Sequence, residues 1–195
     1  YSGTTLLGSA TADSNGAFSI TSSTLSEGSY SLNATTTDVA GNVSLSSSSL
    51  SLTVDATAPD APKSLTTTAT TTSDTTPTIT GNAEAGSTVE IFSGSTSLGT
   101  TTANGSGAFS FTPSSALSAG SHSITAKATD AAGNLSSASS ALSVNIITSR
   151  NELRTAVDAW ISDQTSATAT YGDINTWDVS QITDFVSLFY DQKSF

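Results

Sequence analysis

The sequence predicts a mainly β protein made of tandem β-sandwich repeats, followed by a small segment of mixed α and β structure. Three observations carry this prediction. The first third of the chain reappears in its middle, apolar and polar residues alternate between glycine- and asparagine-rich turns, and the composition changes after Ile147. Short alternating strands joined by such turns are typical of closed sandwiches.

The internal repeat is long and ordered. Gly16-Ala17-Phe18-Ser19 returns as Gly107-Ala108-Phe109-Ser110, at an offset of 91 residues. After one inserted residue the offset becomes 92, and the Asp-Val-Ala-Gly-Asn run at 38–42 returns as Asp-Ala-Ala-Gly-Asn at 130–134. Two copies of one structural unit therefore follow each other along the chain.

The repeat divides the chain into three segments. Tyr1 aligns with Phe92, well inside the second copy, so we expect residues 1–57 to be the C-terminal part of a truncated sandwich. Residues 58–147 form a complete copy, near the size at which a sandwich is stable alone. Pro59 and Pro62 favour extended backbone, which predicts a short, stiff connector between the two copies.

The complete copy shows the period-two pattern of β-strands. We expect strands near residues 78–82, 88–93, 97–102, 108–112, 121–130 and 141–147. The positions predicted to face the core are Ile79, Val89, Ile91, Leu98, Phe109, Phe111, Ile124, Ala126, Ala128, Leu142, Val144 and Ile146. About seven short strands with such turns indicate an immunoglobulin-like (Ig-like) sandwich.

Several short stretches carry a family resemblance. They are Ala85-Gly86-Ser87-Thr88-Val89, Gly107-Ala108-Phe109-Ser110, Gly120-Ser121-His122, the Thr-Asp-Ala-Ala-Gly-Asn turn at 129–134 and the joint at 54–59. Together they cover nearly all of residues 1–147, and they resemble the bacterial Ig-like repeats of large biofilm and adhesion proteins. The resemblance implies a surface-exposed rod of many similar domains.

Residues 148–195 have a different character. Ser149-Arg150-Asn151-Glu152 has the spacing of a capping box, in which the serine hydroxyl and the glutamate carboxylate bind free amides at a helix start. Leu153, Val157, Trp160 and Ile161 then fall on one helical face. We therefore expect a helix with one apolar side.

The stretch from Ile174 to Tyr190 contains Trp177-Asp178-Val179-Ser180 followed by apolar residues at helical spacing. It resembles one repeat of the BspA-like leucine-rich-repeat family of microbial surface proteins, which implies a strand, a short apolar helix and a solenoid that starts here. A single repeat cannot bury its own apolar face. We therefore expect poor coverage for Trp177, Ile182, Phe185 and Phe189.

Composition and charge exclude several functions. The net charge is -11, with 5 basic against 16 acidic residues, so nucleic acid is not expected as a partner. Cysteine is absent, and no apolar stretch approaches the length of a membrane span. The one histidine, His122, aligns with Tyr30 of the first copy, which argues against a catalytic role. We expect no enzyme.

Carboxylates near the joint suggest one chemical hypothesis. Calcium takes about six to eight oxygen ligands, and an acidic chain with few cations suits it. The candidate ligands are Asp38, Asp55, Asp60, Asp74 and Glu84. The resemblance to adhesins adds support, because their joint aspartates often hold calcium. The alternative is that these residues cap turns and solvate the surface.

These expectations favour a non-enzymatic, extracellular surface adhesin or stalk. The Ig-like repeats would act as spacers that present a binding region to a protein or glycan surface ligand. A second hypothesis is a self-assembling subunit of an extracellular filament or surface layer, with copies of the chain as partners. A third is that the repeats are accessory modules of a secreted enzyme.

Overall fold

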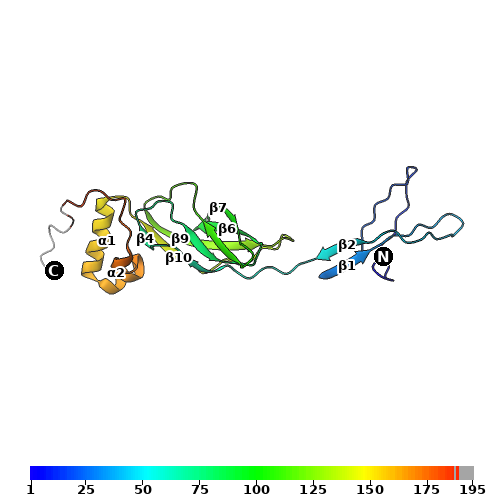
Figure 1. The fold of residues 1–195 in the computed structure, drawn as a ribbon, viewed down its shortest axis with the longest axis horizontal. Coiled ribbons are helices and arrows are strands. Elements are labelled where there is room, and N and C mark those ends of the chain that lie inside the picture. The colour runs from blue at the N-terminus through cyan, green and yellow to red at the C-terminus, as the bar shows by residue number, and fades with distance from the viewer. Residues whose placement is uncertain (187, 189–195) are drawn as a thin grey trace. The chain divides into compact units, whose positions relative to one another are not determined.

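The computed structural model describes residues 1–186 and 188. The chain forms two compact units, Tyr1–Thr57 and Ala58–Phe195 (Figure 1). Strands dominate both units, and the helices lie in the last part of the second. No helix among the described residues is long and apolar enough to cross a membrane.

The second unit contains a two-sheet sandwich. One sheet has the strand order β4-β10-β9-β6-β7, and the other has the order β3-β5-β8. All pairs are antiparallel except β4 with β10, which is parallel. The strands are β3 Lys63–Thr66, β4 Thr71–Thr72, β5 Ile79–Asn82, β6 Thr88–Ser93, β7 Thr96–Thr102, β8 Ala108–Phe111, β9 Gly120–Thr129 and β10 Leu142–Ile146.

The mainly β sandwich class predicted from the sequence is confirmed, and six of its strands match predicted ones to within one residue at both ends. Strands β3 and β4 were not predicted. Their sequences lack apolar alternation, β4 has only two residues, and β3 is interrupted at Ser64, whose φ is 57°. Neither strand carries a period-two signal long enough to detect.

The core lies between the two sheets. Every predicted inward residue is buried or packs against the buried cluster. Val89, Ile91, Ile124 and Val144 have no exposed surface, whereas Leu98 and Leu142 are partly buried at the rim. Burying an Ile or Val side chain of this kind contributes about 1.5–3 kcal/mol, so these positions define the stable part of the unit.

Serine side chains complete one edge of the main sheet. Beyond β9 the chain runs alongside that strand without forming a new one, and the hydroxyls of Ser136 and Ser139 accept hydrogen bonds from the amides of Ala128 and Ala126, at 2.9 and 3.0 Å. Both serines are buried. Hydroxyl groups thus satisfy amides that a neighbouring strand would otherwise bind.

The first unit repeats part of this framework. Strands β1 (Gly28–Leu32) and β2 (Leu50–Val54) pair in the register of β9 and β10, with Gly28 opposite Val54 as Gly120 lies opposite Ile146. The unit contains no further strand, and no residue between 1 and 57 is buried.

The C-terminal part of the second unit is helical. Helix α1 (Arg150–Ser162) begins with the predicted capping box, and helix α2 (Gln164–Tyr171) follows directly. A 3-10 turn, η1 (Ile174–Thr176), comes next. Leu153 and Val157 are buried as expected, whereas Trp160 and Ile161 are partly exposed. Helix α2 was not predicted, because its sequence lacks an apolar stripe.

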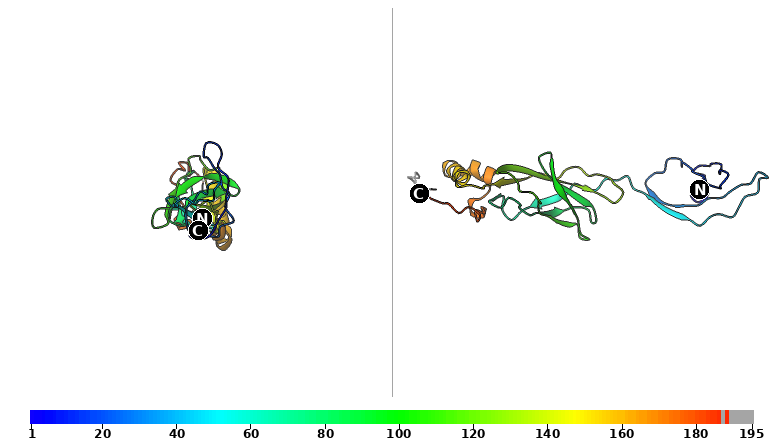
Figure 2. Two further views of the ribbon diagram at one scale, coloured as in Figure 1. Left: turned by 90° about the vertical axis from the view of Figure 1, so that its right-hand side faces the viewer. Right: turned by 90° about the horizontal axis from the view of Figure 1, so that it is seen from above.

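The predicted repeat after Ile174 is only partly seen. Asp178 makes a single parallel bridge with Thr72 instead of a full strand, and residues 181–186 form no helix. Ile182 is only 6% exposed, so the expectation of poor coverage is wrong for this residue. It packs with Ile147 and with buried residues of α1. In the right-hand view of Figure 2, the helices, coloured yellow to orange, lie at one end of the sandwich of the same unit. Phe189 and Tyr190 lie outside the described residues.

Gly107 lies in a turn of the sandwich where a side chain is unfavourable. Gly107 has a φ of +83°, and a Cβ there would lie 2.5 Å from the carbonyl oxygen of Ala83. Gly107→Ala should therefore destabilise the second unit by about 2 kcal/mol or more, because both the backbone conformation and the contact are unfavourable. Gly105→Ala is the matched control, since nothing lies within 4 Å. Urea unfolding of both variants measures the difference, and equal midpoints would contradict this account.

Candidate functional site

The most regular polar feature is one aspartate turn that occurs in both units. In the second unit, Oδ1 of Asp130 accepts from the amides of Ala132 and Asn134, at 2.9 and 2.8 Å, and Oδ2 accepts from the side-chain amide of Asn134 at 2.8 Å. Asp38 makes the same three bonds in the first unit. Both carboxylate oxygens are therefore used by the turn itself.

These bonds change the acidity of the aspartates. The side-chain amide of Asn134 is the main cause that holds the pKa of Asp130 below its ordinary value, and Asn42 does the same for Asp38. Donors that bind the ionised form favour it. The hydrogen bonds of both turns therefore stabilise the ionised form of the aspartate.

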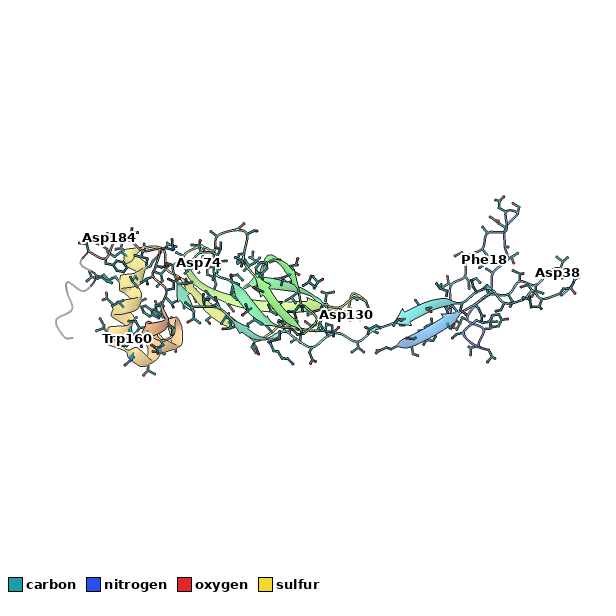
Figure 3. All side chains as sticks on the ribbon, viewed as in Figure 1. Phe18, Asp38, Asp74, Asp130, Trp160 and Asp184 are labelled. Atoms are coloured by element: carbon teal, nitrogen blue, oxygen red, sulfur yellow. The ribbon has the colours of Figure 1, made fainter. Side chains whose placement is uncertain are left out.

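Each of the five candidate calcium ligands lies in a different local setting. In the first unit, Asp38 caps the turn at the tip of the β1–β2 hairpin (Figure 3), whereas Asp55 follows Val54 at the opposite end of that hairpin. The Asp55 carboxylate accepts from the amide of Thr57 at 3.0 Å. The hairpin therefore separates these two carboxylates.

In the second unit the candidates are also apart. Asp74 precedes β5 and accepts from the amide of Thr76 at 2.8 Å, while Glu84 follows β5 in the turn to β6. Asp60 is exposed in the connector. Among the described residues, no three His, Asp or Glu side chains come together to hold a metal ion. The five carboxylates thus do not converge within either unit, and calcium binding stays a prediction.

His122 has a structural position. Its Nε2 lies 2.8 Å from the carbonyl oxygen of Ser118, which can only accept, so Nε2 carries the proton. The Tyr30 hydroxyl donates to the carbonyl of Ser26 at 2.8 Å, the equivalent bond in the first unit. A ring that bonds back to the chain four residues upstream resembles the tyrosine corner of Ig-like folds. His122 therefore links the start of β9 to the preceding loop at Ser118.

The feature that the sequence did not reveal is the junction between the sandwich and the C-terminal segment. Strand β4 lies at the edge of the main sheet, and the Asp178 amide donates to the carbonyl of Thr71 at 2.9 Å while its carbonyl accepts from Ser73 at 2.7 Å. The Gln181 amide donates to the Ser73 hydroxyl at 2.9 Å. The segment thus extends the sheet by one short parallel piece.

A buried amide reinforces the junction from the other side. Asn145 of β10 is only 4% exposed, and its side chain donates to the carbonyl of Thr170 in α2 at 2.7 Å. Gly172 lets the chain approach closely, because a Cβ there would lie 2.5 Å from the Thr70 hydroxyl. Polar threonines and asparagine form this junction, and they give no hydrophobic pattern by which the sequence could reveal it.

The junction borders an open polar cleft. Its lining residues are Ser73, Asp74, Thr75, Thr148, Asp178, Ser180 and Gln181. The backbone amide of Ser180 is the main cause that lowers the pKa of Asp178, and Oδ2 of the same carboxylate accepts from the Thr72 hydroxyl at 3.1 Å. This carboxylate therefore holds the segment on β4.

Comparison with known proteins assigns the fold. A family profile for the bacterial Ig-like domain matches residues 1–56 and 63–148. The chain belongs to the bacterial Ig-like domain family. This profile ends at residue 148, so the resemblance of residues 148–195 to BspA-like repeats stays a prediction.

Two solved structures are similar to this Ig-like chain. One is the BSP domain of a biofilm associated protein, at 25% identity and a TM-score of 0.36, which covers 73% of this chain and 23% of that one. The other comprises fibronectin(III)-like modules of Clostridium thermocellum CbhA, at 17% identity and a TM-score of 0.45. The match covers 75% of this chain and 75% of that one. The chain thus spans less than a quarter of the first structure. No curated protein matches it.

The Asp130 turn predicts a dependence of stability on pH. Because its pKa is lowered in the folded state, the stabilisation is present above the unfolded pKa of about 3.9 and is lost as the pH falls through the lower folded value. Asp130→Asn should lower the melting temperature at pH 7, and the difference from the natural chain should shrink below pH 4.

The control for this experiment is Asn104→Asp. Asn104 caps its turn through Oδ1 with bonds of 3.0 Å to the amides of Ser106 and Ala108, and the first unit carries Asp13 in the equivalent turn. The melting temperature of this variant at pH 7 should stay close to that of the natural chain. A constant difference for Asp130→Asn from pH 7 to pH 3 would refute the charge-based explanation.

Calcium binding is decided by titration of the full chain. If the candidate aspartates hold the ion, millimolar calcium should raise the melting temperature, because a ligand that binds only the folded state stabilises it. Calorimetry should show heat that Asp55→Asn and Asp60→Asn remove. Magnesium serves as the control ion. The absence of both a temperature shift and binding heat would leave turn capping as the role of these carboxylates.

Proposed function

We propose that the chain is a non-enzymatic part of an extracellular surface adhesin or stalk, in which Ig-like units are spacers and the C-terminal segment presents a contact surface. The observation that carries this proposal lies in the second unit. The chain enters the sandwich at one end and leaves it at the other.

The strand register establishes this head-to-tail path. Lys63, the first residue of β3, pairs with Asn82 at the end of β5, and Thr129 pairs with Thr88 just beyond it. The last residues of β10 pair with β4, which holds the C-terminal segment. Within this unit, Asp130 and Trp160 accordingly lie at opposite ends (Figure 3). A module with this path adds its full length to a rod.

The junction makes the C-terminal segment part of a rigid unit. A spacer that presents a binding region works best when the region cannot swing freely, since ordering it on contact would cost entropy. Backbone bonds to β4, the buried Asn145 and the shared packing of Ile147 with α1 provide this rigidity.

The same junction supports the BspA-like interpretation of residues 148–195. Asp178 lies parallel to β4, and β4 lies parallel to β10. Solenoid repeats stack their strands side by side and need a terminal cap that covers the first apolar face. We infer that the sandwich edge and α1 act as this cap for a first leucine-rich repeat.

Composition supports an extracellular, non-catalytic role. The chain has no cysteine and few charges, and hydroxyl side chains satisfy backbone amides in both units. Both ring nitrogens of His122 form hydrogen bonds, Nδ1 with the Ser93 hydroxyl and Nε2 with the carbonyl oxygen of Ser118. These features support the proposal of a non-catalytic role.

Binding of the full chain to an array of purified matrix proteins and polysaccharides tests the proposal. Phe185 and Val186 are 47% and 70% exposed in the C-terminal segment. Replacing both with serine should weaken binding about tenfold or more, as expected for exposed apolar anchors.

The matched control is Leu135→Ser, because Leu135 is 54% exposed on the sandwich. Its binding should equal that of the natural chain. The proposal fails if the chain binds nothing on the array, or if Leu135→Ser alone removes binding. Binding of the chain to immobilised copies of itself would instead favour the self-assembly alternative.

A further inference from the structure

The chain contains two Asn-Gly pairs, and both lie in the turn that leads into a Gly-Ala-Phe-Ser run. Asn104-Gly105 opens this turn in the second unit, and Asn15-Gly16 closes it in the first. Glycine has no side chain to hinder its own backbone nitrogen. An asparagine before glycine is therefore the one whose side-chain amide this nitrogen attacks most easily, and the structure places the two pairs in different settings.

The backbone nitrogen of the pair is accessible only in the second unit. Gly105 is exposed, and a Cβ built on it would meet nothing within 4 Å. Its amide binds no acceptor among the residues that the structure describes. In the first unit, by contrast, the Gly16 amide donates to the carbonyl oxygen of Asp13 at 3.0 Å. The attacking atom is thus available at Gly105 and engaged at Gly16.

The side-chain carbonyl of Asn104 is surrounded by donors. Its Oδ1 accepts from the amides of Ser106 and Ala108, both at 3.0 Å, and from the Ser106 hydroxyl at 2.7 Å. Attack on Cγ places negative charge on this oxygen, and donors already directed at it stabilise that charge. Within the described part of the chain, the side chain of Asn15 accepts no hydrogen bond.

We propose that Asn104 is a site of spontaneous deamidation, activated by the hydrogen bonds that cap its own turn. The backbone nitrogen of Gly105 attacks Cγ of Asn104 and loses its proton to solvent, while the side-chain nitrogen takes up a proton and leaves as ammonia. Solvent water then opens the resulting cyclic imide. The net reaction consumes one water and releases one ammonia, and neither an oxidant nor a reductant takes part.

The aspartate product fits this turn, because the first unit carries aspartate at the equivalent position. Oδ1 of Asp13 accepts from the amides of Asn15 and Ala17, at 2.8 and 2.9 Å, in the same pattern as Oδ1 of Asn104. Isoaspartate would instead add an atom to the main chain, in a turn where Gly107 has no room for a Cβ. Deamidation to aspartate therefore keeps the cap and adds one negative charge to a chain whose net charge is -11.

Incubation of the full chain in heavy-oxygen water tests the proposal. Each deamidation event incorporates a heavy oxygen into the new carboxylate, and mass spectrometry of peptides measures the rate separately at Asn104 and Asn15. In the folded chain at mildly alkaline pH, Asn104 should react about tenfold or more faster than Asn15, because its carbonyl is activated. In guanidinium chloride the two rates should become similar, since only the folded turn distinguishes the pairs.

Two variants separate the attacking nitrogen from the activating donors. Gly105→Ala should slow labelling of Asn104 about tenfold or more in both conditions, because a side chain hinders the attack. Ser106→Ala removes the 2.7 Å hydroxyl donor and should slow labelling about threefold or more in the folded chain, less than in a closed active site because the turn is exposed. In guanidinium chloride this second variant should react like the natural chain.

Three results would overturn the proposal. A lower rate at Asn104 in the folded chain than in guanidinium chloride would show that the turn protects the amide instead of activating it. Labelling of Asn15 at the same rate as Asn104 in the folded chain would show that the local setting has no effect. An unchanged rate in folded Ser106→Ala would show that the cap does not assist the reaction.

Discussion

The central strand β6 is the element on which the closed sandwich depends. It pairs with β9 on one side and β7 on the other, and it sends Val89 and Ile91 into the core. The two units provide a natural comparison. In the first unit, β1 and β2 pair in the same register as β9 and β10, and none of residues 1–57 is buried. The hairpin therefore keeps the same pairing in both units.

The sequence predicted the sandwich well because its signal is local and repeated. Alternation in β6, β8 and β10 marked the inward residues, and the glycine-containing turns marked the ends of the strands. The capping box at Ser149 was equally local. The same alternation is weak or absent in β3 and β4, where pairing with neighbours far along the chain decides the structure. No local pattern can report such a pairing.

The candidate site was less predictable because its chemistry depends on three-dimensional neighbours. Carboxylates near the joint suggested calcium, yet Asp38 and Asp74 each bond to donors only two to four residues away. A short-range cap and a metal ligand look alike in sequence. The junction escaped detection for the opposite reason, since Thr72 and Asp178 meet across more than one hundred residues. Their contact forms at the edge strand β4, whose pairing with β10 cannot be inferred from the sequence alone.

Serine hydroxyls bind backbone amides at equivalent positions in both units. Ser44 and Ser47 bind the amides of Thr36 and Ala34 in the first unit, as Ser136 and Ser139 do in the second. Exposed amides and carbonyls on a strand edge invite pairing with other chains. Because the serines occupy these amides in both units, they remove donors that a strand of another chain could bind along this edge.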